Sequence, residues 1–208
     1  MLFDKIKQLP IYDVFANPKE YSLAIAISII SLLVMTFEPV SGEWLRYQSL
    51  EISNGQWWRI FSANLCHSNW NHWILNIAGL WLMDLFYQPV LSQKTRAALL
   101  IFCMVLNVMM IHFWMEINWY VGLSGALHGY LIGGALLSWN KAKLLNFTII
   151  LITTIKLFAE SVWQINSATE ELISANVLEE AHSFGAVSSV IFWLLWIANS
   201  KIKKPLKN

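Results

Sequence analysis

The chain of 208 residues is too apolar for an ordinary soluble domain, because 57% of its residues are hydrophobic and only 13% are charged. Its net charge of +1 and its lack of a basic stripe with interleaved aromatic residues exclude a nucleic-acid partner. Its twelve tryptophans lie mostly near the ends of apolar runs, as the interfaces of a bilayer require. The composition therefore indicates a polytopic membrane protein.

Residues 1–20 mix charges with prolines and are predicted to form a short cytoplasmic segment. Six apolar runs follow, each close to the ~20 residues with which a helix crosses ~30 Å of hydrocarbon. The runs are Tyr21–Phe37, Trp70–Tyr87, Ala97–Met115, Val121–Trp139, Leu144–Ile165 and Ala181–Asn199. The sequence therefore predicts an all-α bundle of six transmembrane helices over residues 21–199, followed by a basic cytoplasmic tail over residues 200–208.

The connection between the first two runs, Glu38–Asn69, is long and is interrupted by proline and glycine. It carries Trp44, Trp57 and Trp58, and tryptophan favours the level of the lipid headgroups. We therefore expect this connection to lie on the bilayer surface.

The basic residues predict the orientation. With the N-terminus inside, the outer loops hold only Arg46 and Arg59. The inner segments then hold eleven basic residues: Lys5, Lys7, Lys19, Lys94, Arg96, Lys141, Lys143, Lys201, Lys203, Lys204 and Lys207. Since lysine and arginine concentrate on the cytoplasmic side, both termini are predicted to be cytoplasmic. We expect a multi-pass protein of the bacterial inner (cell) membrane.

Several polar side chains are predicted to converge at the outer membrane face. Ser124 lies near the outer end of the fourth run, and His182 lies near the outer end of the sixth. His72 and Asn76 lie near the outer end of the second run, just after His67. Polar and ionisable groups are costly inside a membrane, so they usually serve a pathway or a site.

Gly122-Leu123-Ser124-Gly125 supplies a serine that is open on both sides, because glycine has no side chain. A helix that opens here leaves free backbone N–H groups near the hydroxyl. A nucleophile beside an oxyanion site needs both features. The alternative is that these small residues only allow close packing of transmembrane helices.

His182 is the predicted base for Ser124, because a serine hydroxyl needs a neighbouring group to take its proton. No acid is clearly placed in the sequence to orient His182, and Glu179 and Glu180 are predicted to be solvated. His72 and Asn76 are four residues apart on one helical face, so with the Ser124 backbone N–H they could stabilise an oxyanion. Their alternative role is to hydrogen-bond neighbouring helices.

His128 is a rival base, because it lies four residues after Ser124 and could touch its hydroxyl. A base on the same helix is hard to aim, so substrate recognition or packing is the preferred role. Lys156 and Glu160 are also four apart and are predicted to pair, although an ion pathway could use them. No histidine and carboxylate spacing fits zinc, so neither a metal nor another cofactor is expected.

These motifs resemble those of the rhomboid intramembrane serine proteases. Gly122-x-Ser124-Gly125 is similar to the family's G-x-S-G motif, and Ala181-His182-x-x-Gly185 to its A-H-x-x-G motif. The pattern His67-x-x-x-x-His72-x-x-x-Asn76 and the pair Trp58-Arg59 also match, so the resemblance covers about Trp57 to Ser189. One departure is Ser189, where the family's sixth helix has a second glycine of G-x-x-x-G. The six-helix core and Leu127-His128-Gly129 look like the rhombosortase branch, which is associated with trimming C-terminal sorting tails.

The resemblance implies an intramembrane endopeptidase with a Ser124–His182 dyad and an oxyanion site of His72, Asn76 and the Ser124 backbone. Its substrate would be a transmembrane or C-terminal membrane-anchoring segment, cut near the outer face of the bilayer. Gly122, Gly125, His128 and His67 are assigned to substrate binding or packing. The alternatives are a catalytically silent rhomboid-like protein that binds transmembrane helices, and a small transporter.

The fifth run is predicted to act as a lateral gate for the substrate, because its many β-branched residues lower helix propensity slightly. A cross-link between positions Trp73 and Trp163 is therefore expected to slow cleavage of helical substrates.

Overall fold

The computed structural model describes residues 14, 17–163 and 177–202. Its long helices are α3 (Ser22–Thr36), α7 (Trp70–Tyr87), α8 (Gln93–Trp114), α9 (Ser124–Leu137), α10 (Lys143–Trp163) and α12 (Glu179–Ile202). Each of them overlaps one predicted apolar run, and α8, α10 and α12 begin one to four residues before the predicted start. Most of the predicted N-terminal segment and C-terminal tail lie outside the described residues, as does Ile165 at the end of the fifth run.

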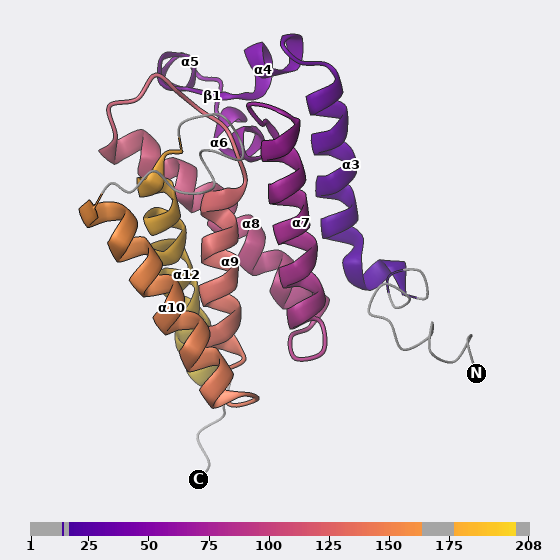
Figure 1. Ribbon diagram of the computed structural model, residues 1–208, viewed down its shortest axis with the longest axis vertical. Coiled ribbons are helices and arrows are strands. Elements are labelled where there is room, and N and C mark those ends of the chain that lie inside the picture. Colours follow the sequence, from indigo (N-terminus) through magenta and orange to yellow (C-terminus); the bar gives the residue numbers. More distant parts are fainter. Residues whose placement is uncertain (1–13, 15–16, 164–176, 203–208) are drawn as a thin grey trace.

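Successive long helices run in opposite directions through one bundle (Figure 1). Short elements cover the end at which α3 stops and α7, α9 and α12 begin. In chain order they are α4 (Val40–Leu45), β1 (Tyr47–Gln48), α5 (Ser49–Ser53), α6 (Arg59–Ser62), the 3-10 helix η2 (Ala63–Leu65) and β2 (Trp119–Tyr120). A separate 3-10 helix, η1 (Pro18–Tyr21), precedes α3. The predicted convergence of the polar residues at one end of the bundle agrees with this arrangement.

Four helical segments among the described residues are long and apolar enough to cross a membrane, which makes this a multi-pass membrane protein. They are Pro18–Thr36, Gln93–Trp114, Lys143–Val162 and Glu179–Ser200. The helix α9 has 14 residues and is therefore about 21 Å long at 1.5 Å per residue. It is shorter than the predicted run Val121–Trp139, because Gly122 has a positive φ of 119° that no α-helix contains. The count of six spans stays a prediction.

Helices α9 and α12 cross at very short range through facing glycines. A Cβ at Gly185 would run into the backbone carbonyl of Gly125, and a Cβ at Gly129 would run into that of Gly185. Small residues permit such close approach of two backbones. Ser189 fits the same contact, since its Cβ would lie 3.1 Å from a Cβ placed on Gly133. The departure from the second glycine therefore leaves the crossing intact.

The first connection is an ordered structure held by Arg59. The guanidinium of Arg59 is buried and donates to the backbone carbonyls of Arg46 and Glu43, at 2.8 Å each. Strand β1 pairs antiparallel with β2, with Tyr47 opposite Tyr120. Because β2 ends two residues before Gly122, the first connection is tied to the segment that leads into α9.

The tryptophans of the first connection are exposed, with relative exposures of 62% for Trp44, 56% for Trp57 and 51% for Trp58. An indole that is apolar and also carries an N–H group suits the level of the lipid headgroups. The surface position of this connection on a bilayer stays a prediction.

Candidate active site

Ser124 is the first residue of α9, and the segment before it is fixed by the first connection. The backbone N–H of Gly122 donates to the carbonyl of Ala63 at 3.1 Å, and the hydroxyl of Tyr120 donates to the carbonyl of Gly122 at 3.1 Å. The first N–H groups of a helix have no acceptor within it, so the start of α9 is expected to leave backbone donors near the Ser124 hydroxyl. The helix start thus combines a half-buried serine hydroxyl with backbone donors, which are the groups that a nucleophile beside an oxyanion site needs.

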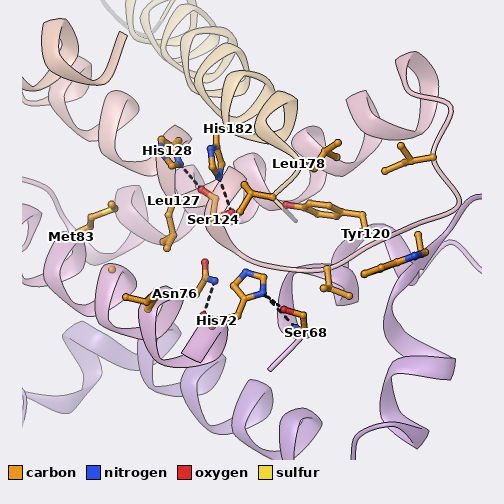
Figure 2. A pocket seen from close by; sticks show the side chains of 16 residues that line it. Ser68, His72, Asn76, Met83, Tyr120, Ser124, Leu127, His128, Leu178 and His182 are labelled. Carbon is orange, nitrogen blue, oxygen red and sulfur yellow. Dashed lines mark hydrogen bonds between the residues drawn. The ribbon is translucent and has the colours of Figure 1, made fainter. Parts of the chain in front are cut away.

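His182 reaches Ser124 from another helix. It is the fourth residue of α12, and its Nε2 lies 3.1 Å from Oγ of Ser124 (Figure 2). The glycine crossing explains this contact, because Gly125 follows the serine directly and Gly185 lies three residues after the histidine. The imidazole is buried, with 4% relative exposure. Its other nitrogen, Nδ1, lies 3.2 Å from Oε2 of Glu160 in α10.

His72 faces this pair from α7, across the cavity (Figure 2). Its Nδ1 accepts a hydrogen bond from the backbone N–H of Ser68 at 3.4 Å and lies 3.0 Å from the Ser68 hydroxyl. In a neutral ring the proton is therefore on Nε2, which can donate. A Cβ on Gly122 would lie 2.8 Å from that Nε2, so only glycine lets the imidazole approach the segment before Ser124.

Asn76 lies one turn further along α7 and points into the same space (Figure 2). Its Nδ2 donates to the backbone carbonyl of His72 at 2.9 Å, and its Oδ1 is buried without a hydrogen-bond partner among the described residues. An amide nitrogen carries two protons, so one N–H stays available to an acceptor in the cavity. The predicted common face of His72 and Asn76 agrees with this geometry.

His128 does not touch the Ser124 hydroxyl, and the expectation that it could is wrong. Its Nδ1 bonds the backbone carbonyl of Ser124 at 2.8 Å, and its Nε2 lies 3.1 Å from the ammonium of Lys156. An ammonium only donates, so Nε2 accepts and Nδ1 donates, and no ring nitrogen is left for the hydroxyl. The ring stacks on that of His182 with centroids 4.1 Å apart, and it also lines the cavity.

His67 lies behind His72 and does not line the cavity. The two imidazoles meet edge to face, with ring centroids 5.0 Å apart. Burial, and to a lesser degree the neighbouring His72, lowers the pKa of His67 to about 3, so its ring is neutral near pH 7. Its place supports a packing role and offers no contact to a substrate.

A cavity of about 740 Å³ lies between α7 and the starts of α9 and α12. Its wall includes polar groups from five side chains, those of Ser124, His182, His72, Asn76 and His128. The rest is mostly apolar, including Leu75, Met83, Tyr120, Val121, Leu127 and Leu178. An apolar cleft with a few convergent polar groups is the usual form of a binding site. Within the described part of the chain, no three His, Cys, Asp or Glu side chains are grouped to hold a metal ion.

Glu160 is the contact that the sequence interpretation missed, because it assigned this residue only to a pair with Lys156. That pair exists, with Nζ and Oε1 2.5 Å apart, but the second carboxylate oxygen faces His182. The sequence carried no signal for this contact, because the rotation of a helix about its axis is set by packing between helices. Thr153, Leu157 and Glu160 recur at helical spacing and are all buried, so they mark the inward face of α10.

A half-buried serine and a buried histidine thus lie in contact at one end of a helical membrane bundle, beside an apolar cavity. Residues 54–199 match the rhomboid domain family. Since this match covers most of the chain, the protein belongs to the rhomboid family, whose members are generally serine intramembrane proteases acting on membrane-embedded protein substrates. None of the individually curated proteins compared with the chain matches it.

Proposed function

We propose that this protein is an intramembrane serine endopeptidase in which Ser124 is the nucleophile and His182 is its general base. The observation that carries the proposal is the 3.1 Å contact between Nε2 of His182 and Oγ of Ser124. The two residues are 58 positions apart and come from different helices, and this is the geometry that proton transfer to a base requires. Membership of the rhomboid family supports it further.

In the proposed reaction, Oγ of Ser124 attacks the scissile carbonyl carbon while its proton passes to Nε2 of His182. The oxyanion would accept hydrogen bonds from the Ser124 backbone N–H, from Nε2–H of His72 and from the free N–H of Asn76. His182 then gives its proton to the leaving amine, and the C–N bond breaks to leave an acyl-enzyme. Water, deprotonated by the same histidine, releases the acyl group and restores the serine.

The proposed setting is a six-span protein of the bacterial inner membrane, with both termini cytoplasmic and the membrane domain over residues 21–199. In this orientation the end of the bundle that holds Ser124 faces outward, which agrees with the position of the short elements α4 to α6. A serine inside a bilayer needs access to water, and the cavity provides the space. We place the scissile bond near the outer membrane face.

The proposed substrate is a transmembrane or C-terminal membrane-anchoring segment, and trimming of sorting tails in the manner of a rhombosortase is the specific version of it. Two residues of Leu127-His128-Gly129, the leucine and the histidine, line the cavity. They lie within one turn of Ser124, so they are placed where residues beside the scissile bond would pass.

A serine-directed fluorophosphonate probe on detergent-solubilised protein tests the proposal. We expect labelling of the wild type and its loss in Ser124→Ala and in His182→Ala, because both the nucleophile and its base are needed. Ser53→Ala removes an exposed serine of α5 and should label like the wild type. Undiminished labelling of Ser124→Ala would contradict the protease, and the absence of labelling in the wild type would favour the silent helix-binding protein.

A further inference from the structure

We infer that Glu160 is a positioning residue for His182, so that the enzyme works with a Ser124–His182–Glu160 relay and not with a serine–histidine pair alone. This inference rests on the proposed function. The three side chains come from three helices, α9, α12 and α10. The contacts form a continuous line, from Oγ of Ser124 to Nε2 of His182 at 3.1 Å and from Nδ1 of His182 to Oε2 of Glu160 at 3.2 Å.

The relay determines which nitrogen of His182 carries the proton. An ionised carboxylate can only accept hydrogen bonds, so Nδ1 of His182 must donate to Glu160. Nε2 is then unprotonated and can accept the proton of Ser124. In the other tautomer Nε2 would carry a proton, and His182 could not act as the base. The carboxylate also stabilises the imidazolium that forms when the proton arrives.

The burial of Glu160 supports a role beyond solubility. Its relative exposure is 7%, although a glutamate near the end of a membrane helix can reach the headgroups if it points outward. A buried carboxylate is costly unless it is paired, and both oxygens of Glu160 have partners. Lys156 takes Oε1, and its side chain is 44% exposed, so it pairs with Glu160 from the edge of the bundle.

A pair formed only for mutual neutralisation would not need His182. The spacing of four residues along α10 already lets Lys156 and Glu160 meet on the helix surface. Glu160 instead lies on the buried stripe with Thr153 and Leu157, and it turns one oxygen to the histidine. Lys156 also donates to Nε2 of His128, whose ring stacks on His182. The imidazole is thus held at its edge by Glu160 and on its face by His128.

The test measures kcat and KM for Glu160→Asp, Glu160→Ala and Glu160→Gln in liposomes. The reporter substrate is a single-span protein with a glycine pair near the outer end of its helix. We expect kcat to fall by about 10²-fold or more in the alanine and glutamine variants, since an amide in place of the orienting carboxylate costs about 10⁴ in a soluble serine protease. KM should change by less than about threefold, because Glu160 contacts His182 and the change acts on proton transfer and not on substrate binding.

The order of kcat among the three variants distinguishes a positioning role of Glu160 from a merely structural one. Glutamine has the shape of glutamate, so a merely structural role predicts that Glu160→Gln is the best of the three. The relay predicts the order Asp, then Ala, then Gln, because a glutamine amide can donate to Nδ1 and hold His182 in the wrong tautomer. Glu180→Gln is the matched control. It removes the same charge from an exposed side chain two residues before His182, and it should keep wild-type kcat.

The failure of this inference is distinguishable from the failure of the proposed function. Wild-type kcat in Glu160→Gln, with Ser124→Ala and His182→Ala inactive, overturns the relay and leaves the protease standing. Absence of any Ser124-dependent turnover in the wild type overturns both. If the variants do not fold, ¹⁵N NMR of the wild-type enzyme can determine the tautomer of His182. The His182 signals are assigned by their loss in His182→Ala. The relay requires a protonated Nδ1 and a bare Nε2 in the neutral ring, and the opposite tautomer refutes it.

Discussion

At the scale of the residue, the serine and the histidine are proposed to act on the same proton and should therefore behave as one unit. Ser124→Ala or His182→Ala alone is expected to reduce turnover by on the order of 10⁴ or more, and the double variant should be little worse, because members of a catalytic unit are not additive. Rates of reporter cleavage in liposomes measure this. His128→Ala should keep measurable activity, since the ring bonds only the backbone of Ser124 and the ammonium of Lys156.

Asn76 should contribute less than the dyad, because it is one of three proposed oxyanion donors. Loss of one such donor lowers turnover by about 10²–10³-fold in a soluble serine protease. We expect the loss of turnover in Asn76→Ala to be of this size or smaller. Thermal unfolding in detergent should change little, since among the described residues the amide donates only to a backbone carbonyl of its own helix. A large fall in melting temperature with unchanged activity per folded molecule would assign Asn76 to helix packing instead.

His67 should make stability depend on pH. Its pKa is lowered to about 3 in the folded protein, below the ordinary value of 6.5, so the unfolded chain binds the extra proton between these values. Above pH 6.5 both states carry a neutral ring and His67 costs no stability. As pH falls from 6.5 towards 3, protonation of the unfolded chain lowers the free energy of unfolding by up to about 1.4 kcal/mol per pH unit. Melting curves at pH 7 and pH 5 should show a smaller loss in His67→Phe than in the wild type. An equal loss in both proteins would contradict this account.

At the scale of the element, the crossing of α9 and α12 is the contact on which the site depends. Gly185→Ala should destabilise the protein by about 1–3 kcal/mol, because its Cβ meets the carbonyl of Gly125 and the helices must separate. The same separation should draw His182 away from Ser124 and reduce kcat. Ser189→Ala keeps a small side chain one turn further on and should be nearly neutral. Melting temperature and kcat measured on both variants check this prediction.

The sequence predicted the type and position of the helices well, because each apolar run has a length that a bilayer imposes. It also predicted which polar residues share one end of the bundle, since depth can be counted along each run. It could not predict which way each side chain points around its helix. Glu160 was therefore missed, and the contact of His128 with the Ser124 hydroxyl, which the spacing had left open beside substrate binding or packing, is not formed.

Trp73 shows the same limit. Its indole N–H donates to the hydroxyl of Ser31 in α3, at 3.0 Å, so this side chain faces α3. It is a poor anchor for the proposed cross-link to α10, and Leu75, which lines the cavity from α7, is the better position. A lateral gate at α10 stays a prediction. Rotation about the helix axis depends on packing between helices, and the apolar pattern alone does not contain it.

At the scale of the whole molecule, orientation can be tested with single cysteines. Cys66 and Cys103 are buried, so they should stay unlabelled in intact cells. Ser53→Cys lies at the end of the bundle that we place outside and should react with a membrane-impermeant maleimide. Lys141→Cys lies between α9 and α10 at the opposite end and should react only after permeabilisation. The reverse pattern would invert the proposed topology and place cleavage at the cytoplasmic face.

The pairing of β1 with β2 ties the segment before Ser124 to the short elements of the first connection. Tyr47 pairs with Tyr120, and the carbonyl of Ala63 holds Gly122, so the segment before Ser124 depends on short elements that can open locally. Heating should therefore abolish activity several degrees below the temperature at which the helices melt. An enzyme warmed into that interval and cooled again should regain full activity, because the bundle itself never came apart.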